Sequence, residues 1–334
     1  MHTGVFHDLD FRAEGKSVSY ISVPMSVDRS PYFQVKVPIV RLRNGDGPSL
    51  LLMAGNHGDE YEGEITLSRL SRLLEPDMIR GSVTIIPFAN APAVMAARRC
   101  SPLDGGNLNR AFPGDNAGTP TQRIAHVLEH TLFPAHDVVF DIHAGGTSME
   151  HLGCALIEHI ADPARHAHAL ELMTTMGLPY GFVAENGADA PTSMAAAARA
   201  GAIGISGEFG GCATATVTSI KMTSLAIDRI LLKLGIVEKP VLNESLPDAE
   251  PTKLLALKTH RQAIYATRRG WYEPAVALGD DVQAGDLAGW YHDFERLEQP
   301  EEPLYFQETG VVLSRRLHTD SQAGDCLIQV ALNA

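Results

Sequence analysis

The stretch Gly55–Glu60, with the sequence GNHGDE, directly follows the apolar run Ser49–Ala54, which is typical of a buried strand. It places His57 and Glu60 three residues apart on a glycine-rich turn. A second histidine, His143, ends another apolar run and is followed by small residues. Two histidines and one glutamate, with a fourth position left for water, are the ligand set of many hydrolytic zinc sites. The spacing therefore predicts a metal-dependent hydrolase that holds one Zn2+ per chain.

A carboxylate follows a third apolar run in the same manner. Glu208 comes shortly after the run 202–206, and two glycines follow Phe209. A glutamate beside a metal can take a proton from the attacking water and later give it to the leaving amine. We therefore predict that Glu208 is the general base.

The loop between the two histidine segments, residues 104–114, is rich in Gly and Asn. It carries Arg110, whose planar guanidinium matches a carboxylate, and we predict that it anchors the substrate. Arg98 and Arg99 are candidates to polarise the scissile carbonyl, although a helix-end charge explains them equally well. Asp141, two residues before a predicted ligand, is a candidate to orient that histidine, and an ordinary polar strand residue is an equal alternative.

One competing motif falls on a predicted helix. His126, Glu129 and His130 fit the inverted zincin pattern HxxEH. A solvated polar face explains these three side chains without a metal, because apolar residues occupy the other face of the same helix. The chain has no Walker loop and no GxGxxG, and Ser206 does not complete GxSxG, so nucleotide-binding and serine hydrolase functions have little support.

The composition limits the possible partners. With 334 residues, of which 45% are apolar, the chain can bury a large core and form a large domain with a smaller one. Its formal charge of −13 argues against nucleic acid or an anionic membrane as a partner. No signal peptide or membrane span is expected from the apolar runs. The four cysteines are far apart without a CxxC motif, so we expect a reduced, cytoplasmic protein.

Apolar strand-like runs alternate with helical patterns between residues 49 and 236. The strands are expected at 49–54, 82–88, 138–143, 153–157 and 202–206. Helices are expected around residues 67–74 and 124–132, and from Val217 to Leu234, where Gly235 ends the last one. This pattern predicts an α/β fold with helices on both faces of a sheet. Ligands of such sheets bind at the carboxyl ends of the strands, where the candidate site residues lie.

A change of pattern divides the chain into two parts. Residues 241–256 are rich in Pro and charge and are predicted to be a linker between a hydrolase domain, 1–240, and a small all-β domain, 257–334. The first 45 residues are a β lead-in to the larger domain. The motif QAGD occurs at 283–286 and again at 322–325, and the segment resembles the half-sandwich of biotinyl and lipoyl carriers. No lysine follows Lys258, so a pocket-shaping role is favoured over a covalent carrier.

Together, in this order, the motifs resemble the succinylglutamate desuccinylase/aspartoacylase family, a branch of the zinc-carboxypeptidase-like fold. The resemblance covers roughly residues 45–236 and implies a mixed α/β sheet followed by a C-terminal β domain that closes over the site. Its motifs are Gly55–Glu60, Asn107–Gly114, Asp141–His143 and the segment at Glu208.

The resemblance also implies a role for each site residue. It places zinc on His57, Glu60 and His143, and it makes Glu208 the acid/base group. Asn109 and Arg110 would grip the substrate carboxylate. Arg99 is the nearest match to the oxyanion arginine of the family, although it lies further from the Asn-Arg pair here.

Within the family, the chain looks most like the N-acetyl-2,4-diaminobutyrate deacetylases of ectoine breakdown. We therefore expect hydrolysis of N-acetyl-L-2,4-diaminobutyrate, a small-molecule N-acyl amino acid, to acetate and the free amino acid. Alternatives are an aspartoacylase, a succinylglutamate desuccinylase, a metallocarboxypeptidase or a metal-binding protein without turnover, and a homo-oligomer stays open. An acidic rim that would suit a cationic substrate side chain is expected from Asp59, Glu62, Glu64, Glu185 and Asp189.

Overall fold

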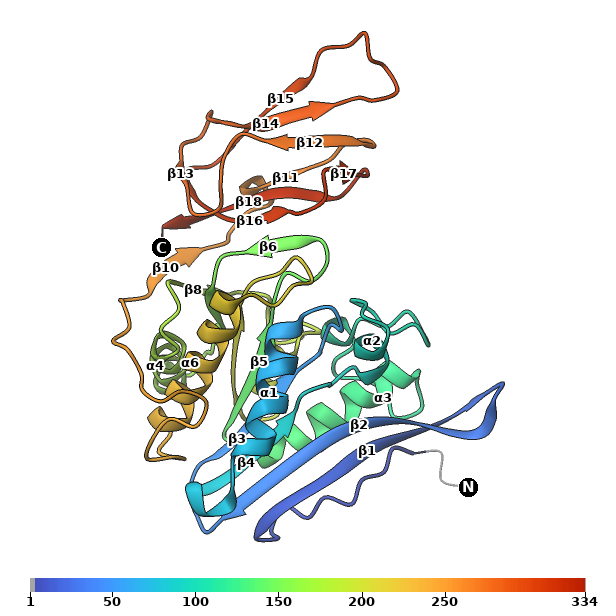
Figure 1. The fold of residues 1–334 in the computed structure, drawn as a ribbon, viewed down its shortest axis with the longest axis vertical. Helices are drawn as coiled ribbons and strands as arrows, with labels where there is room; N and C mark the ends of the chain where they lie inside the picture. Colours follow the sequence, from blue (N-terminus) through green and yellow to red (C-terminus); the bar gives the residue numbers. More distant parts are fainter. Residues whose placement is uncertain (1–3, 334) are drawn as a thin grey trace.

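The computed structural model describes residues 4–333, and its largest element is a mixed sheet that runs through most of the molecule (Figure 1). The strand order is β1-β2-β4-β3-β5-β9-β7-β8-β10-β18-β16-β13, with β11 paired to β18 and β6 paired to β16. The strands of the first part are β1 (Gly15–Val27), β2 (Ser30–Asn44), β3 (Ser49–Ala54), β4 (Gly81–Ile86), β5 (Val138–His143), β6 (Met149–His151), β7 (Cys154–Glu158), β8 (Tyr180–Ala184) and β9 (Ile203–Glu208).

The C-terminal part adds further strands to this sheet and builds a second, four-stranded sheet with the order β15-β14-β12-β17. Its strands are β10 (Lys253–Ala256), β11 (Ala263–Tyr265), β12 (Gly270–Pro274), β13 (Asp281–Val282), β14 (Leu287–His292), β15 (Glu302–Tyr305), β16 (Gly310–Arg316), β17 (Asp320–Ser321) and β18 (Cys326–Asn333). The α/β fold with a small β-rich C-terminal part is therefore confirmed.

Helices cover both faces of the sheet because its central strands are apolar on both sides. Leu50 and Leu52 of β3 belong to a core with α1, α4 and α6, whereas Leu51 and Met53 of the same strand pack with α3 and α5 on the other face. The helices are α1 (Tyr61–Leu73), α2 (Ala91–Met95), α3 (Pro120–Val127), α4 (Pro163–Thr175), α5 (Ser193–Arg199) and α6 (Val217–Lys233). Alternating side chains of one strand thus pack into two separate hydrophobic cores.

Local signals set several element ends as predicted. Thr216 caps α6 by accepting a hydrogen bond from the backbone N–H of Ser219, and Gly235 follows the helix with a left-handed φ of 67°. The strand predicted at 202–206 runs on to Glu208, so this carboxylate ends β9 itself. β6, β8 and β10 were not predicted.

The linker predicted at 241–256 contains β10, which pairs in parallel with β8 and antiparallel with β18. The main sheet therefore passes from the first part of the chain into the second. The two-domain division at this segment stays a prediction.

The two QAGD motifs form the same turn. In each, the N–H of Gln283 or Gln322 donates to the aspartate carboxylate three residues later, at 2.7 and 2.8 Å. The glycines have φ values of 95° and 93°, which a residue with a Cβ rarely adopts. The internal repeat is therefore a repeated turn that follows β13 and β17.

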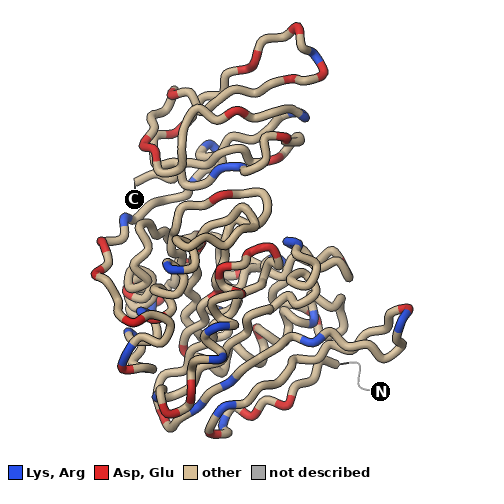
Figure 2. The backbone as a smooth tube through the Cα atoms, viewed as in Figure 1, with Lys and Arg blue, Asp and Glu red and all other residues tan. Residues whose placement is uncertain are grey.

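Charged side chains are dispersed along the chain (Figure 2). In the described part of the chain, no helix combines the length and the apolar character needed to cross a membrane.

Candidate active site

The site lies where parallel strands β3, β5 and β9 end side by side. β5 pairs with both neighbours, and His143 at its end stands opposite Glu208 at the end of β9. The loop after β3 brings His57 and Glu60 to the same edge before α1 begins. The sheet therefore gathers residues that lie up to 151 positions apart in the sequence.

Two glycines shape the loop after β3, for different reasons. Gly55 has a left-handed φ of 68°. Gly58 is needed for close approach, because a Cβ there would lie 2.0 Å from the carbonyl carbon of Ala93 in α2. Its N–H donates to the carbonyl of Arg98 at 2.9 Å. Contact with α2 therefore explains Gly58.

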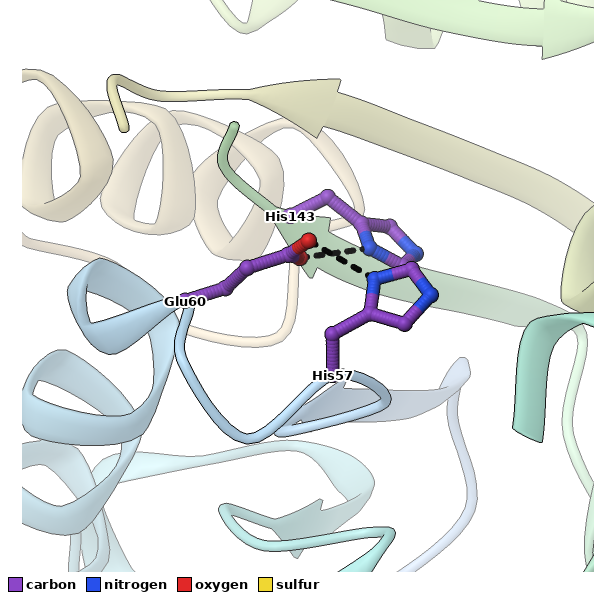
Figure 3. A group of neighbouring side chains, drawn as sticks. All are labelled: His57, Glu60 and His143. Carbon is purple, nitrogen blue, oxygen red and sulfur yellow. Dashed lines mark hydrogen bonds and ion pairs between the residues drawn. The ribbon is translucent and has the colours of Figure 1, made fainter. Parts of the chain in front are cut away.

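The predicted metal ligands converge in a buried cluster (Figure 3). Nδ1 of His57 lies 2.7 Å from Oε1 of Glu60, and Nδ1 of His143 lies 2.9 Å from Oε2 of the same carboxylate. One ligand atom from each residue lies within 4.8 Å of the others. Within residues 4–333, this is the one group of histidine, cysteine and acidic side chains that meets this criterion. The His-Glu-His metal-binding triad is thus present.

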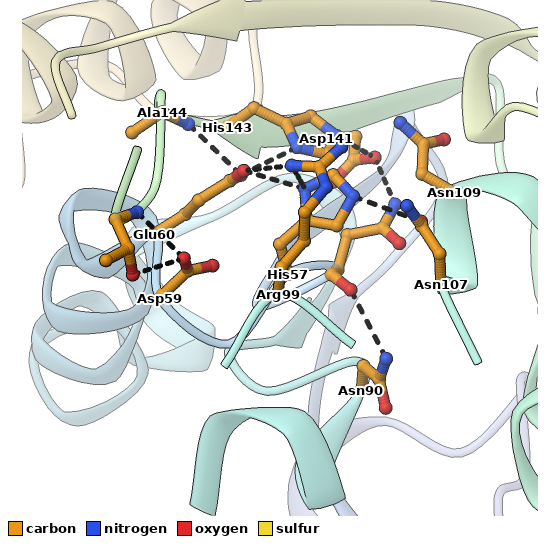
Figure 4. Close-up of polar contacts among 12 residues, drawn as sticks. His57, Asp59, Glu60, Asn90, Arg99, Asn107, Asn109, Asp141, His143 and Ala144 are labelled. Atoms are coloured by element: carbon orange, nitrogen blue, oxygen red, sulfur yellow. Dashed lines mark hydrogen bonds and ion pairs between the residues drawn. The ribbon is translucent and has the colours of Figure 1, made fainter. Parts of the chain in front are cut away.

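The second nitrogen of each histidine is held by a neighbour (Figure 4). Nε2 of His57 lies 3.1 Å from Oδ1 of Asn107, and Nε2 of His143 lies 2.8 Å from Oδ2 of Asp141. An acceptor at Nε2 keeps the proton there and leaves the Nδ1 lone pair for a cation. The side chains therefore fit a divalent metal, and Asp141 makes the hydrogen bond that we predicted for it.

Asp141 is itself held by several donors. Its Oδ2 accepts from Nδ2 of Asn56 at 2.9 Å and from the hydroxyl of Ser193. Burial alone would raise the pKa of Asp141, but His143 and these hydrogen bonds outweigh it and lower the pKa. The anionic acceptor behind His143 is thereby stabilised.

The charges at the triad favour an ionised Glu60. Burial opposes the charge, but the two histidines that face this carboxylate hold its pKa well below the usual range. Burial likewise opposes a charge on His143, and the carboxylates of Asp141 and Glu60 nevertheless raise its pKa. The centre is built to hold charge in a buried place.

The expected acidic rim is wrong for three of its five members. Asp59, Glu62 and Glu64 are buried, because they lie at or in the start of α1, which packs against the sheet. Oδ2 of Asp59 accepts two hydrogen bonds from Thr147. Burial raises the pKa of Glu62 to about 7 and that of Glu64 to about 8. These carboxylates do not form a surface that would attract a cationic substrate.

A cavity of about 300 Å³ opens above the triad. All the other residues predicted for the site line it, namely Glu208, Arg99, Asn109 and Arg110. Oε2 of Glu208 is buried and has no hydrogen-bond partner among the described residues. The structure therefore brings every residue predicted for the site to one place.

The two adjacent arginines differ in position. A guanidinium nitrogen of Arg99 lies 3.5 Å from Oε1 of Glu60 and 3.3 Å from Nδ1 of His57. Arg98 does not line the cavity. Arg99 is thus the arginine that reaches the triad.

The lining also includes residues that sequence reasoning missed. Met149 and His151 come from β6, and Ser193 and Met194 come from the start of α5. β6 has only three residues and pairs with β16, more than 160 positions away, so no local pattern marks it. Thr192, a cap residue just before α5, was the available signal for the second segment.

The competing HxxEH motif has a different explanation from the one that we expected. Glu129 is buried, and its carboxylate forms a two-point ion pair with the guanidinium of Arg199 at 2.8 Å. The rings of His126 and His130 stack with their centroids 4.2 Å apart. An ion pair to α5, and not a solvated face, accounts for the glutamate.

Known proteins with the same fold and family were found by sequence and by structure. A family model described as the succinylglutamate desuccinylase/aspartoacylase catalytic domain matches residues 46–234. The N-alpha-acetyl-L-2,4-diaminobutyric acid deacetylase of Halomonas elongata is 36% identical over 324 residues, which cover 97% of this chain and 93% of that protein.

Two solved structures superpose over nearly the full length. A succinylglutamate desuccinylase/aspartoacylase from Rhodobacter sphaeroides matches with a TM-score of 0.92 and 30% identity over 99% of both chains. The product-bound ectoine utilization protein EutE (DoeB) from Ruegeria pomeroyi matches with a TM-score of 0.92 and 28% identity, also over 99% of both chains. With the His-Glu-His site, these matches show that the chain belongs to the succinylglutamate desuccinylase/aspartoacylase family of metal-dependent N-acyl amino acid deacylases.

Proposed function

We propose that this chain is a zinc-dependent amide hydrolase that removes the acetyl group of N-acetyl-L-2,4-diaminobutyrate, giving acetate and the free diamino acid. The observation that carries the chemistry is the register of β5 and β9, which sets Glu208 beside the ligand His143. The observation that carries the substrate is the similarity to the Halomonas elongata deacetylase, supported by the ectoine utilization protein of Ruegeria pomeroyi. Ectoine degradation is the process to which we assign it.

The triad fits a zinc ion, which when bound supplies a Lewis acid for the amide carbonyl and for water. Glu208, which lines the cavity, takes a proton from the attacking water. It then delivers the proton to the amide nitrogen as the C–N bond breaks, so that the amine leaves neutral. Arg99, which lies against Glu60, stabilises the negative charge that develops on the acyl oxygen.

The substrate carboxylate binds to Asn109 and Arg110 in this proposal. Oδ1 of Asn109 accepts from the N–H of Ser193 at 2.8 Å, so the amide Nδ2 is left to donate. Arg110 donates one hydrogen bond to the backbone carbonyl of Asn109 at 2.7 Å, and its other N–H groups are available for a carboxylate. A cytoplasmic location is a further part of the proposal.

Amine release by the purified, zinc-assayed protein tests the assignment. The panel contains N-acetyl-diaminobutyrate (both regioisomers), N-acetylaspartate, N-succinylglutamate and a dipeptide. Preference for an acetyl-diaminobutyrate would support both chemistry and pathway. Preference for another N-acyl amino acid would support amide hydrolysis and contradict the assignment to ectoine degradation. Stoichiometric zinc without turnover on any compound would favour a binding protein.

Arg110→Ala tests the anchor separately. We expect kcat/KM to fall by about tenfold or more for substrates with a carboxylate, since a charge-assisted pair is lost. An acetylated amine without a carboxylate should be hydrolysed equally by both proteins. Equal losses on both kinds of substrate would contradict the anchoring role.

A further inference from the structure

Asp59 lies in the loop that carries two of the metal ligands, between His57 and Glu60, but it is not part of the triad. The residue is buried. Its Oδ2 accepts a hydrogen bond from the N–H of Thr147 at 2.8 Å and another from the hydroxyl of Thr147 at 2.7 Å (Figure 4). Hydrogen bonds to a carboxylate are among the stronger ones in proteins. The loop after β3 is therefore bonded at two points to the loop after β5.

The loop after β5, residues 144–149, forms one wall of the cavity. Its lining residues are Ala144, Gly145, Ser148 and Met149. Thr147 is exposed and does not line the cavity. The bonds between Asp59 and Thr147 therefore hold this wall without occupying any of the space that a substrate would fill.

Gly146 brings the same loop directly against Asp59. A Cβ at Gly146 would lie 2.8 Å from Oδ2 of Asp59, and the φ of this glycine is 60°. On the other side of the loop, the N–H of Ala213 donates to the carbonyl of Gly146 at 2.8 Å, and the N–H of Cys212 donates to the carbonyl of Met149 at 3.0 Å. The wall is thus held between the metal loop and the segment that follows Glu208.

We infer that Asp59 is a positioning residue, which fixes the cavity wall of residues 144–149 to the metal loop and thereby increases the affinity for the substrate. This inference rests on the proposed deacylase function. A wall that is already in place does not have to be ordered when the substrate binds. Without these bonds only a fraction of the molecules would hold the wall in place, and the apparent affinity would fall by that fraction. The triad would be kept, because Glu60 bonds both histidines directly.

Thr147→Val tests the inference without changing the metal loop. It deletes the hydroxyl donor at nearly constant size, and we expect KM for N-acetyl-diaminobutyrate to rise by about three- to tenfold. The kcat and the zinc content should be unchanged. Thr147→Ser keeps the hydroxyl and should restore KM. Thr319→Val makes the same change at an exposed position outside the cavity and should have the KM of the wild type. An unchanged KM in Thr147→Val, or a fall in kcat and zinc content alone, would overturn the inference.

A double variant tests whether the two residues act through the same contact. Asp59→Asn removes the carboxylate and keeps one oxygen acceptor, so KM should rise in this variant as well. In Asp59→Asn combined with Thr147→Val, KM should rise no further than in the more affected single variant, because both changes remove one interaction. Fully additive effects on log KM would show that the two residues act separately, and would overturn the inference.

Amide hydrogen exchange of the zinc-loaded protein separates this inference from the deacylase function. In Thr147→Val the amides of residues 145–149 should exchange about tenfold faster, whereas those of β5 and α1 should be unchanged. Gly146→Ala, whose Cβ would displace the Asp59 carboxylate, should show the same change and serves if the first variant does not fold. Unchanged exchange in the loop would overturn the positioning role. Failure of the wild-type protein to hydrolyse any compound of the panel would instead overturn the deacylase function.

Discussion

The metal centre and the β6 wall of the same cavity are built in different ways. His57, Glu60 and His143 are buried, and each makes hydrogen bonds to residues of neighbouring strands or loops of the central sheet. The β6 residues, 149–151, are half-buried, and their strand is held by β16 from the C-terminal part. Glu150 forms an ion pair with Arg315 of β16 at 3.0 Å.

This difference indicates that the metal centre and the β6 wall have separate roles. The metal-binding triad is fixed by packed neighbours and buried charge, so that small changes there should be costly. The β6 wall of the cavity depends on a strand pairing near the surface, where changes should be tolerated. We therefore expect mutations in the first region to affect turnover and metal binding, and mutations in the second to affect substrate choice.

The largest effect is expected at Glu208. Glu208→Gln should reduce kcat by about 10²–10⁴-fold, because the general base is lost while the shape is kept. Zinc content, measured by atomic spectroscopy, should stay at the wild-type level. Glu185→Gln, at an exposed position outside this cavity, is the matched control and should be fully active. Full activity of the Glu208 variant would remove this residue from the mechanism.

A smaller effect, a loss of metal affinity, is expected at Asp141, which bonds the metal ligand His143. Asp141→Asn keeps an acceptor for Nε2 of His143 but removes its charge. Metal affinity, measured by competition with a chelator, should fall by about 10–100-fold. Ser193→Ala deletes one donor to Asp141 and should have a weaker effect in the same direction. An unchanged affinity in Asp141→Asn would mean that β5 alone orients the ligand.

His136, just before β5, is a buried histidine whose pKa is lowered, whereas the pKa of His143 is raised. His136 is buried, and its nitrogens bond the carbonyl of Leu132 and the hydroxyl of Thr84, both at 2.7 Å. Burial lowers its pKa to about 4, so the unfolded chain binds a proton before the folded protein does. The stability that His136 contributes is complete above its unfolded pKa of about 6.5 and decreases as the pH falls towards 4.

Chemical denaturation at pH 7 and pH 5 checks this expectation. Between these values the wild-type protein should lose about 2 kcal/mol more free energy of unfolding than His136→Gln, which keeps a donor and an acceptor without titrating. Turnover at pH 7 should be similar in both proteins, because His136 does not line the cavity. Parallel losses in the two proteins would show that other groups govern the acid sensitivity.

The smallest effect on catalysis is expected from a change that weakens the β6 wall of the cavity. Arg315→Ala removes a partly exposed ion pair, which contributes about 0–1 kcal/mol. KM should rise by up to about fivefold, with kcat and zinc content nearly unchanged. Arg315→Lys should recover most of the loss. A large fall in kcat would contradict the division between the two regions.

The residues that could be predicted from the sequence are those with a local signal. The apolar runs in the sequence predict β3, β5 and β9. The common location of the polar residues at their ends follows from the geometry of parallel strands. β6, β8 and β10 are three to five residues long and depend on distant partners. The burial of Glu62 and Glu64 also depends on packing of α1 that no short pattern reveals.

The pairing of β6 with β16 has a consequence for the order in which the protein is made. The side chains of Glu150 and Arg315 meet across 165 positions of sequence. At synthesis rates of about 5–20 residues per second, the ribosome needs roughly 10–30 s to add the second partner after the first. During that interval β5 and the loop after β3, which carry the three metal ligands, are already available, whereas β6 lacks its partner strand. A nascent chain would therefore be able to capture zinc before it can discriminate between substrates.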